Sequence, residues 1–414
     1  MSMVAENQND RTCPHCGNRV ADSATKCPHC GERLFPLLRT RETVIVLCAA
    51  LLVVLFFVTG FIARGYHQKL ADLGQQWFVT GEQQLKLGNA TQALADFHNA
   101  LVYAPDDTQI QLRLALALAA AGRNSEASSY LLGLLAHAPA DAPVNLALAR
   151  IAVTSGSESD ALRYYHGAIY GVWPNAAEAN RVKTRLELCQ FLISHQDISD
   201  AEAELIALAS DIPREGESSI EEQTGELFLK VGDANRALAE FRDALDSPRP
   251  PAGSFRGAGL AAFQLGDYSL AQYYLERTSR LLKGDPSVST PLEMSRLILA
   301  WDPYATGLST AERLTRVRHD FEQAFTRLQS CAEDKGIDLR DKTVASDFST
   351  FYAKATTLRP LLTPQGLRRN PGLLETTMSL IFGIENLAAQ KCGPLQGLDQ
   401  ALILIEKSPR NVQQ

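Results

Sequence analysis

The sequence predicts a mainly α-helical protein in which one membrane-spanning helix separates a small cysteine module from a long helical repeat region. Three observations carry this prediction: a run of 21 residues without a charged side chain at 43–63, small residues that recur every 34 positions after it, and two Cys-x-x-Cys pairs before it. The chain has 414 residues, of which 45% are hydrophobic and 21% charged, as is ordinary for folded protein. This length is enough for two or three folded units.

The charge pattern argues against one class of partner. The formal net charge is −7, and Lys and Arg are dispersed along the chain instead of forming a cluster. Proteins that bind nucleic acid usually carry a basic patch that neutralises phosphates. We therefore expect no nucleic-acid partner.

The first predicted element is a cysteine module at residues 12–34. The motif CPHCG occurs twice, with its cysteines at Cys13, Cys16, Cys27 and Cys30. Two such pairs can supply four thiolates to one tetrahedral Zn²⁺, and the Gly after each pair suits the positive φ that closes a metal knuckle. The duplicated motif resembles the short zinc ribbons at the termini of bacterial proteins. A four-cysteine site leaves no open position for substrate water, so we expect the zinc to be structural and the module to serve in docking. The histidines lie inside their knuckles, where the flanking thiolates block access to the metal, and both are expected to be exposed.

Thiol redox chemistry is the alternative for this module, because Cys-Pro-His-Cys also occurs in the active sites of thioredoxin-fold oxidases. That fold needs a much longer βαβ segment than the module provides, and it uses the motif once. The duplication therefore favours a metal site.

The second element is the apolar run at 43–63, which is flanked by Arg39, Arg41 and Arg64. As a helix it would extend ~31 Å, about the hydrocarbon thickness of a bilayer. It has no polar face, which a helix buried in a soluble core would usually have. Because 42 residues precede it and no small-x-small cleavage site follows, we expect an uncleaved transmembrane anchor. Residues 66–73 are expected to form a short connector.

Topology follows from thiol chemistry and from charge. Thiolate ligands persist in a reducing compartment, so the cysteine module is expected in the cytoplasm. Within about 20 residues of the span, four basic residues lie on its amino-terminal side and two, Arg64 and Lys69, on the other. If the chain is a single-pass protein of a bacterial inner membrane, the rest of it lies in the periplasm.

The third element is a repeat region at residues 74–285. Gly88, Gly122 and Gly156 are spaced by 34 residues, and an alanine follows each of them five positions later. This period resembles the tetratricopeptide repeat, in which small residues let two antiparallel helices approach closely. The resemblance implies an α-solenoid of six repeats that start at Gly74, Thr108, Ala142, Val182, Ser218 and Ala252, with short insertions at 176–181 and 216–217.

The resemblance also implies that the first helix of each repeat lines a concave groove that binds an extended peptide or a helix. Matching the repeats to the family pattern gives a largely apolar inner wall, which is formed by Phe78, Leu85, Leu112, Leu116, Leu146, Val153, Leu186, Ile193 and Leu229. The groove would then bind a protein partner through apolar burial. The alternative is that the chain's own carboxy-terminal helices fill it.

Residues 286–414 are expected to form a helical cap on the solenoid, with helices at 292–301, 309–331, 342–356, 371–389 and 395–405. Ser309 and Glu312 form a capping-box pattern at the start of the longest helix. No catalytic motif is found, and His319 and Asp320 are expected to be solvated. In an oxidising periplasm, Cys331 and Cys392 are expected to form a disulfide, whereas Cys189 at a small-residue position is expected to be buried.

These elements predict a membrane-anchored protein interaction scaffold that is not an enzyme, has no small-molecule substrate and holds zinc only as a structural ion. The alternative is a signalling or regulatory relay, in which the cysteine module passes an external binding event to a cytoplasmic partner. An enzymatic carboxy-terminal domain is a third hypothesis. A pull-down with the cysteine module deleted separates the first two, since a scaffold would keep its external partners and a relay would lose only its cytoplasmic one.

Overall fold

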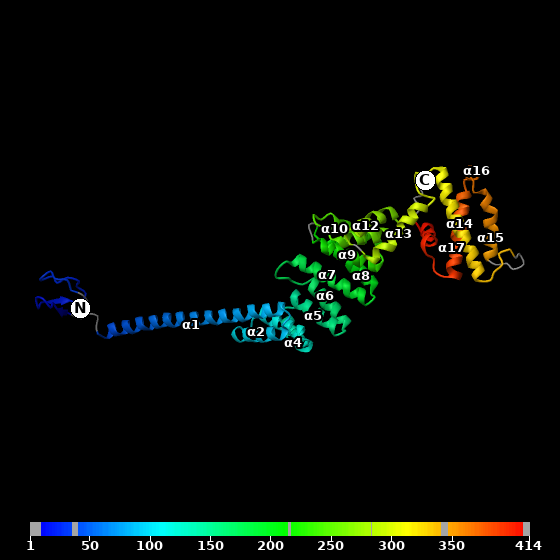
Figure 1. The fold of residues 1–414 in the computed structure, drawn as a ribbon. Helices are drawn as coiled ribbons and strands as arrows, with labels where there is room; N and C mark the ends of the chain where they lie inside the picture. The colour runs from blue at the N-terminus through cyan, green and yellow to red at the C-terminus, as the bar shows by residue number, and fades with distance from the viewer. Residues whose placement is uncertain (1–9, 35–39, 214–216, 283, 341–346, 409–414) are drawn as a thin grey trace, which may run out of the picture. The chain divides into compact units, whose positions relative to one another are not determined.

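The computed structural model describes residues 10–34, 40–213, 217–282, 284–340 and 347–408. In these ranges two short strands precede eighteen α-helices and one 3-10 helix, and the predicted mainly helical fold class is confirmed (Figure 1). The chain divides into two units, residues 1–134 and 135–414, and each is described by itself.

The amino-terminal module is a two-stranded antiparallel hairpin with a loop beyond it. Strands β1 (Asp10–Thr12) and β2 (Arg19–Ala21) pair so that Arg11 lies opposite Val20. The core of the module consists of only four side chains, those of Cys13, Val20, Cys27 and Leu34. A core this small cannot supply much apolar burial.

Helix α1 (Thr40–Lys86) is one uninterrupted helix of 47 residues (Figure 1). The expectation that residues 66–73 form a separate connector is therefore wrong, because these residues continue helix α1. That stretch contains no proline, and the neighbouring Gly65 and Gly74 both lack the positive φ that ends a helix. The anchor segment and the first helix of the repeat region consequently belong to a single rod of ~70 Å.

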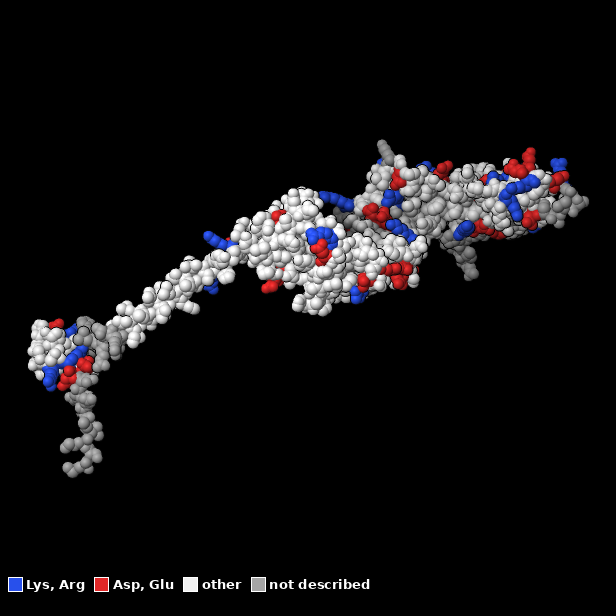
Figure 2. Space-filling view, turned by 90° about the horizontal axis from the view of Figure 1, so that it is seen from below, with Lys and Arg blue, Asp and Glu red and all other residues white. Residues whose placement is uncertain are grey.

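The apolar part of α1 is exposed. Helix α1 is long and apolar enough to cross a membrane, with a mean hydropathy of 3.0 in its most apolar window, and none of that window is buried by the protein. Phe61, for example, is 81% exposed. On the face seen in Figure 2, no charged side chain interrupts this stretch. Such a surface is unfavourable in water and suits a lipid environment.

In the first unit, the end of α1 packs against α2 (Ala90–Tyr103), and α2 packs against α3 (Thr108–Ala120). Helix α4 (Asn124–His137) begins in this unit. The ring of Phe97 from α2 fills the space over Gly81 of α1, where a larger residue would collide with it. The glycine thus permits the close approach of the two helices.

The second unit continues with four antiparallel helix pairs. These are α5 (Ala142–Thr154) with α6 (Glu158–Ile169), α7 (Ala177–Ser194) with α8 (Ile198–Asp211), α9 (Ser218–Val231) with α10 (Ala234–Leu245), and α11 (Ala252–Gln264) with α12 (Tyr268–Leu281). The first helices of successive pairs also contact each other, α7 with α9 and α9 with α11. The first helices therefore line one common face.

The repeat register is visible in two sets of residues. Six alanines at equivalent places in the second helices are completely buried, namely Ala93, Ala127, Ala161, Ala201, Ala237 and Ala271. The turn between the two helices has a left-handed residue in every repeat. It is a glycine in five of them, and in the fourth it is Gln196 with φ 66°. The fourth repeat therefore lacks the glycine that marks this turn in the other repeats.

The last helices form a bundle that joins the solenoid through α13 (Pro286–Trp301), which packs on α12. The bundle consists of α14 (Thr310–Asp334), α15 (Asp347–Leu358), the 3-10 helix η1 (Arg359–Leu361), α16 (Pro364–Arg369), α17 (Leu373–Cys392) and α18 (Gly397–Lys407). Helix α14 packs on α17, and α18 packs on both α17 and α13. The capping box of Ser309 and Glu312 is confirmed.

The predicted carboxy-terminal helices are present, with two main differences. Helix α13 begins at Pro286 instead of 292, because Asp285 caps it and the proline occupies its first turn, where no amide donor is needed. The prediction missed η1 and α16. The start of the helix predicted at 342–356 lies outside the described residues, as does residue 216 of the second predicted insertion.

Candidate metal centre and interaction surfaces

The two Cys-x-x-Cys loops have the same backbone geometry. The amide of Cys13 donates to Asn18 O at 2.9 Å, and the amide of Cys27 donates to Glu32 O at 2.8 Å. Gly17 and Gly31 close the loops with φ of 72° and 75°, which a side chain would disfavour. The repeated sequence therefore folds as a repeated knuckle.

The knuckles bring four sulfur atoms together. All four Sγ atoms of Cys13, Cys16, Cys27 and Cys30 lie within 4.8 Å of one another. The Sγ atoms of Cys13 and Cys30 are 3.7 Å apart, as are those of Cys16 and Cys27. Tetrahedral zinc with Zn–S bonds of ~2.3 Å requires sulfurs ~3.8 Å apart. The donor set thus fits one zinc ion, and four thiolates leave no coordination position open.

The pKa values of two of these thiols, Cys27 and Cys30, are shifted in opposite directions. Burial raises the pKa of Cys27, but the backbone N–H groups of Cys30 and His29 outweigh burial and lower this pKa to about 7. At Cys30 the backbone N–H of Glu32 lowers the pKa, but burial and the other three thiols outweigh it and raise the pKa to about 12. Four thiols this close cannot all ionise by themselves. A divalent cation makes that possible.

The two histidines of the motif lie outside the sulfur cluster. His15 and His29 are both exposed, and neither belongs to the group of residues whose ligand atoms converge in the described part of the chain. Their positions agree with the prediction of an all-cysteine ligand set.

The nine predicted groove residues lie on first helices, but they offer little open apolar surface. Leu112 and Leu186 are buried, and the seven others, which are Phe78, Leu85, Leu116, Leu146, Val153, Ile193 and Leu229, are half-buried. Side chains at these places pack largely against neighbouring helices. Their role in partner binding remains a prediction, and the expected apolar character of the wall is reduced.

Ion pairs between successive first helices were missed by the sequence analysis. In the first unit Glu82 of α1 pairs with Arg113 of α3 at 3.0 Å. In the second unit, Arg150 of α5 pairs with Glu187 of α7 in the same way.

Further along the second unit, Arg256 of α11 pairs with Glu226 of α9 at 2.8 Å. Opposite charges roughly one repeat apart in the sequence are the signal that could have shown all three pairs. Each half-exposed pair contributes little stability. Together they make the face that is lined by the first helices, called the inner face below, more polar than predicted.

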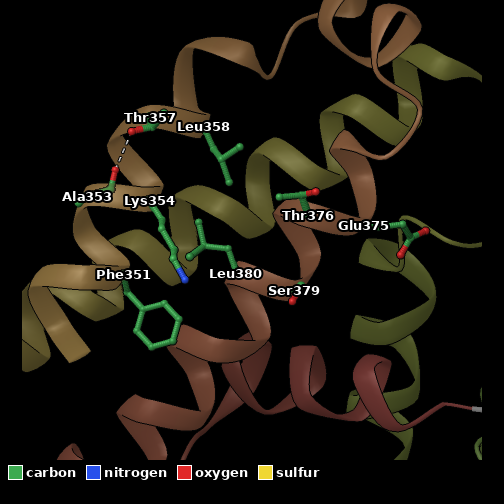
Figure 3. A pocket seen from close by; sticks show the side chains of 9 residues that line it. All are labelled: Phe351, Ala353, Lys354, Thr357, Leu358, Glu375, Thr376, Ser379 and Leu380. Atoms are coloured by element: carbon green, nitrogen blue, oxygen red, sulfur yellow. Dashed lines mark hydrogen bonds between the residues drawn. The ribbon is translucent and has the colours of Figure 1, made fainter. Parts of the chain in front are cut away.

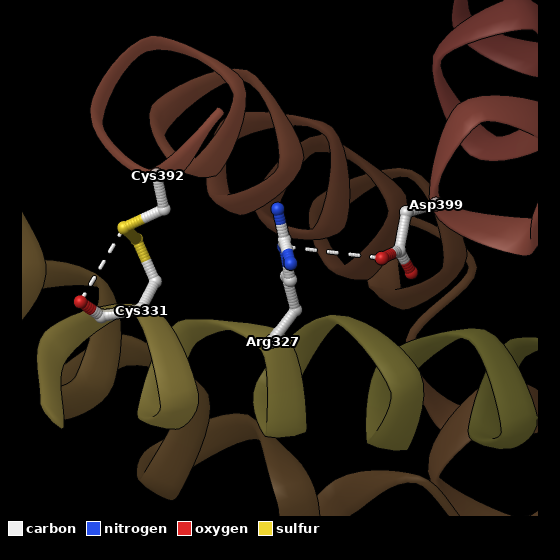
Figure 4. Close-up of a disulfide and its surroundings, with 4 residues drawn as sticks. All are labelled: Arg327, Cys331, Cys392 and Asp399. Atoms are coloured by element: carbon white, nitrogen blue, oxygen red, sulfur yellow. Dashed lines mark hydrogen bonds and ion pairs between the residues drawn. A yellow bond between two sulfur atoms is a disulfide. The ribbon is translucent and has the colours of Figure 1, made fainter. Parts of the chain in front are cut away.

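The carboxy-terminal bundle brings the two predicted cysteines together. Cys331 of α14 and Cys392 at the end of α17 are joined by a disulfide, with their Cα atoms 5.8 Å apart (Figure 4). One turn before Cys331, Arg327 reaches Asp399 of α18 at 3.9 Å. The covalent bond and the ion pair therefore tie three helices together.

The remaining cysteine with a predicted environment, Cys189 of α7 in the fourth repeat, is separate from the disulfide. Cys189 is completely buried, as expected for a packed thiol. Burial raises its pKa to about 12, so this thiol is unreactive at neutral pH.

Asp320 differs from its prediction. It was expected to be solvated, but it is completely buried, because it lies on the same face of α14 as Val317, Phe321 and Ala324, which form the bundle core. Burial, with a contribution from Asp302, raises its pKa to about 8. Neither carboxylate oxygen has a hydrogen-bond partner among the described residues.

Two further groups extend this picture of the bundle. His319 stacks on Trp301, with ring centroids 3.5 Å apart. Glu385 of α17 is buried and, like Asp320, has no hydrogen-bond partner for its carboxylate among the described residues, and burial raises its pKa to about 8. The bundle thus holds two acids that favour the neutral form.

A surface pocket of about 850 Å³ lies between α15 and α17 (Figure 3). Phe351, Leu358 and Leu380 supply apolar surface, and Lys354 and Glu375 lie toward opposite sides of it in the view. The Thr357 hydroxyl that borders it already donates to Ala353 O. This arrangement can accept an apolar group beside the charges of Lys354 and Glu375.

Comparison with known protein families agrees with this geometry. A tetratricopeptide-repeat model matches residues 84–151, a second tetratricopeptide-repeat model matches residues 223–286, and a zinc-ribbon domain model matches residues 10–34. The chain therefore contains tetratricopeptide repeats and an amino-terminal zinc ribbon. No curated protein matches it in sequence.

Several solved structures of low sequence identity also match parts of this chain. PilF of Pseudomonas aeruginosa is 16% identical over 54% of this chain and 96% of its own, with a TM-score of 0.40. The type IV pilus biogenesis factor PilW is 15% identical over 53% of this chain and 98% of its own, also with a TM-score of 0.40. Yeast Tom70 is 13% identical over 76% of this chain and 58% of its own, with a TM-score of 0.37. These scores carry no conclusion about function.

Proposed function

We propose that this chain is a single-pass protein of a bacterial inner membrane whose periplasmic solenoid acts as a scaffold for a protein partner. The observation that carries the proposal is helix α1, which joins an exposed apolar segment directly to the first helix of the repeats. Only residues 64–73 separate the two, which is ~15 Å of helix. The first repeat is thereby held close to the bilayer, where an envelope partner would be met.

The cysteines support the proposed orientation. Those of the zinc ribbon are free thiols, whereas Cys331 and Cys392 are joined. Thiolate metal ligands suit a reducing compartment and a disulfide suits an oxidising one. The apolar segment of α1 lies between these two groups in the sequence. A cytoplasmic ribbon and a periplasmic bundle account for both.

In this proposal each region has one task. The ribbon holds one structural zinc ion and docks in the cytoplasm, residues 74–285 form six tetratricopeptide repeats, and residues 286–414 cap the solenoid. The bundle helices make their main contacts with α13 and with each other. These contacts support the proposal that the bundle leaves the inner face of the solenoid free to bind a partner. The chain is proposed to be a non-enzymatic binding protein.

Orientation is tested by thiol labelling in intact cells. With a membrane-impermeant maleimide, Cys331 and Cys392 should become labelled only after treatment with a reductant, and the ribbon cysteines only after permeabilisation and chelation. Replacement of each group of cysteines by serine identifies the labelled sites. Labelling of the ribbon in intact cells, or free Cys331 and Cys392 before reduction, would contradict the proposal.

The scaffold role is tested by site-specific photo-crosslinking in membranes. Gln190 is exposed on α7 and occupies the same repeat position as Arg150 and Glu226 on the inner face. A crosslinker there should capture a discrete partner. The control is Tyr273 on the second helix α12, which is 56% exposed. Equal capture at both positions would mean that the inner face is not the binding surface.

The relay remains a second candidate because α1 is continuous. A helix without a hinge can transmit a displacement of the first repeat to the membrane segment. Deleting the ribbon separates the two functions, since a scaffold keeps its periplasmic crosslink and its phenotype, whereas a relay keeps the crosslink and loses the phenotype.

A further inference from the structure

An acidic cavity lies in the second unit between α8, α9 and α10. Its volume is about 540 Å³, and Ala209, Ser210, Ile212 and Pro213 form one side of it. The other side carries four carboxyl groups, those of Glu221, Glu240, Asp243 and Asp246. The described lining includes no lysine or arginine. The cavity is therefore strongly selective for positive charge.

Glu221 is a buried acid in the lining of the cavity. It lies in the first turn of α9 and is only 8% exposed. Over the described residues, its carboxylate forms neither a hydrogen bond nor an ion pair. Burial raises its pKa, and Asp243 and Asp246 add to the shift. At Glu240 the same effects, burial with Asp243 and Glu221 nearby, raise the pKa to about 7. A nearby cation would stabilise both carboxylates.

The preceding repeat shows what such a cation looks like. There Arg185 of α7 is buried, with a side chain 6% exposed. It donates through Nε to Glu204 of α8 at 3.1 Å and pairs with Asp211 through Nη1. One guanidinium thus satisfies two acids between helices.

The two sites occupy the same register. Arg185 and Glu221 are each the fourth residue of their repeats, which start at Val182 and Ser218. Glu204 and Glu240 are equivalent in the same way. They are 36 residues apart in the sequence, as are Arg185 and Glu221 and the starts of the two repeats. In the later repeat an acid therefore stands where the earlier repeat supplies its own arginine, and the facing glutamate is retained.

We propose that the acidic cavity between α8, α9 and α10 binds an arginine side chain supplied by a protein partner. A planar guanidinium with five N–H donors can engage two carboxylates at once, as Arg185 does with Glu204 and Asp211 in the neighbouring repeat. A metal ion fits less well. In the described part of the chain, the four ribbon cysteines are the only such group with converging ligand atoms.

This inference deepens the proposed scaffold function and rests on it only for the source of the arginine. Its tests use purified protein, whereas the scaffold tests use crosslinks in membranes. A cavity that fails to bind arginine would leave the results at Gln190 unchanged.

The first experiment titrates the full-length protein, in detergent micelles, with N-acetylarginine amide and follows binding by calorimetry. Saturable binding is expected, with none for the citrulline analogue, which has the same shape but no charge. Glu221→Gln and Glu240→Gln should each weaken binding about tenfold. The matched control is Asp200→Asn, an exposed acid in the first turn of α8. Its affinity should equal that of the unmodified protein.

The second experiment places an arginine of the chain itself in the cavity. Glu221→Arg restores the residue type of the preceding repeat, so it should abolish binding of the probe and raise the melting temperature. Circular dichroism separates this outcome from misfolding, and the glutamine variants keep the proposal testable if the arginine variant does not fold.

Three results would overturn the inference. Unchanged affinity in both glutamine variants would place the binding elsewhere. Spermidine binding as tightly as the arginine probe would indicate a free polyamine instead of a protein side chain. Binding that is absent in the unmodified protein and appears only in Arg214→Ala would mean that the chain supplies its own arginine, since Arg214 directly follows Pro213 in the sequence.

Discussion

The zinc ribbon and the helical repeats hold their folds by opposite means. In the described residues the ribbon core has four side chains, and two of them, Cys13 and Cys27, belong to the candidate metal centre. The repeats bury an alanine and a large side chain in every helix pair, such as Ala237 and Phe241. This difference means that the ribbon has too few other stabilising contacts to keep its fold when one interaction is lost. The helical region, by contrast, tolerates buried acids without hydrogen-bond partners among the described residues and a turn with a left-handed Gln196.

The largest expected effect is removal of the metal. A chelator should abolish the ribbon's structure while the helices keep theirs, because metal binding supplies most of the folding free energy of so small a module. Amide signals of residues 10–34 and the helical circular dichroism report the two regions separately. The exposed His15→Ala and His29→Ala serve as controls and should retain zinc, whereas Cys16→Ser should lose it. A ribbon that keeps its structure without metal would remove the contrast between the regions.

The next effect tests apolar packing in the repeats. The ring of Phe241 is completely buried against Gly225 and Gly257. Phe241→Ala should lower the free energy of unfolding by about 3–5 kcal/mol through the lost burial and the cavity left behind. Denaturant unfolding of the helical signal measures the loss. Tyr273→Ala, at a half-exposed ring, should change it far less. Equal losses would indicate that the repeats do not depend on this core.

A smaller effect concerns the buried acid in the bundle. An unfolded Asp has a pKa of ~3.9, whereas burial raises that of Asp320 to about 8. Between these values the unfolded state has lost a proton that the folded state keeps. The free energy of unfolding should therefore fall as pH rises from ~4 to ~8 and stay level above that.

Asp320→Asn should reduce this slope and stabilise the protein by about 1–3 kcal/mol at alkaline pH. Glu385 acts with the same sign, so some slope should persist. Unfolding curves recorded across this pH range provide the measurement. Asp334→Asn on the exposed face of α14 is the control and should leave the slope unchanged. If both variants behave alike, the acid is not buried in solution.

The smallest effect is at the turn of the fourth repeat. Gln196 adopts the left-handed conformation that glycine adopts in the five other repeats. Gln196→Gly should stabilise the repeats by about 1 kcal/mol, since a side chain disfavours this conformation. The reverse change at an equivalent turn, Gly156→Gln, should destabilise by a similar amount. Melting temperatures of the two variants should thus move in opposite directions, and a shift of both in one direction would argue against the shared register.

The sequence by itself determined the features that depend on neighbouring residues. Metal ligands in a repeated knuckle, an apolar run of bilayer length and a period of 34 residues are all local patterns, and the physics that produces them acts within a few turns of chain. The ligand set of Cys13, Cys16, Cys27 and Cys30 and the helical repeats were predictable for this reason.

Only the tertiary structure decided which faces are covered and which charges meet. From the sequence alone, Asp320 is an acidic helix residue of the kind that is usually solvated. Packing of α17 against α14 makes it a core residue. Glu221 resembles any acid in a first helical turn until α8 and α10 enclose it. Burial and pairing arise from segments far apart in the chain. The free energy of a charged group depends on that enclosure more than on its own sequence neighbours.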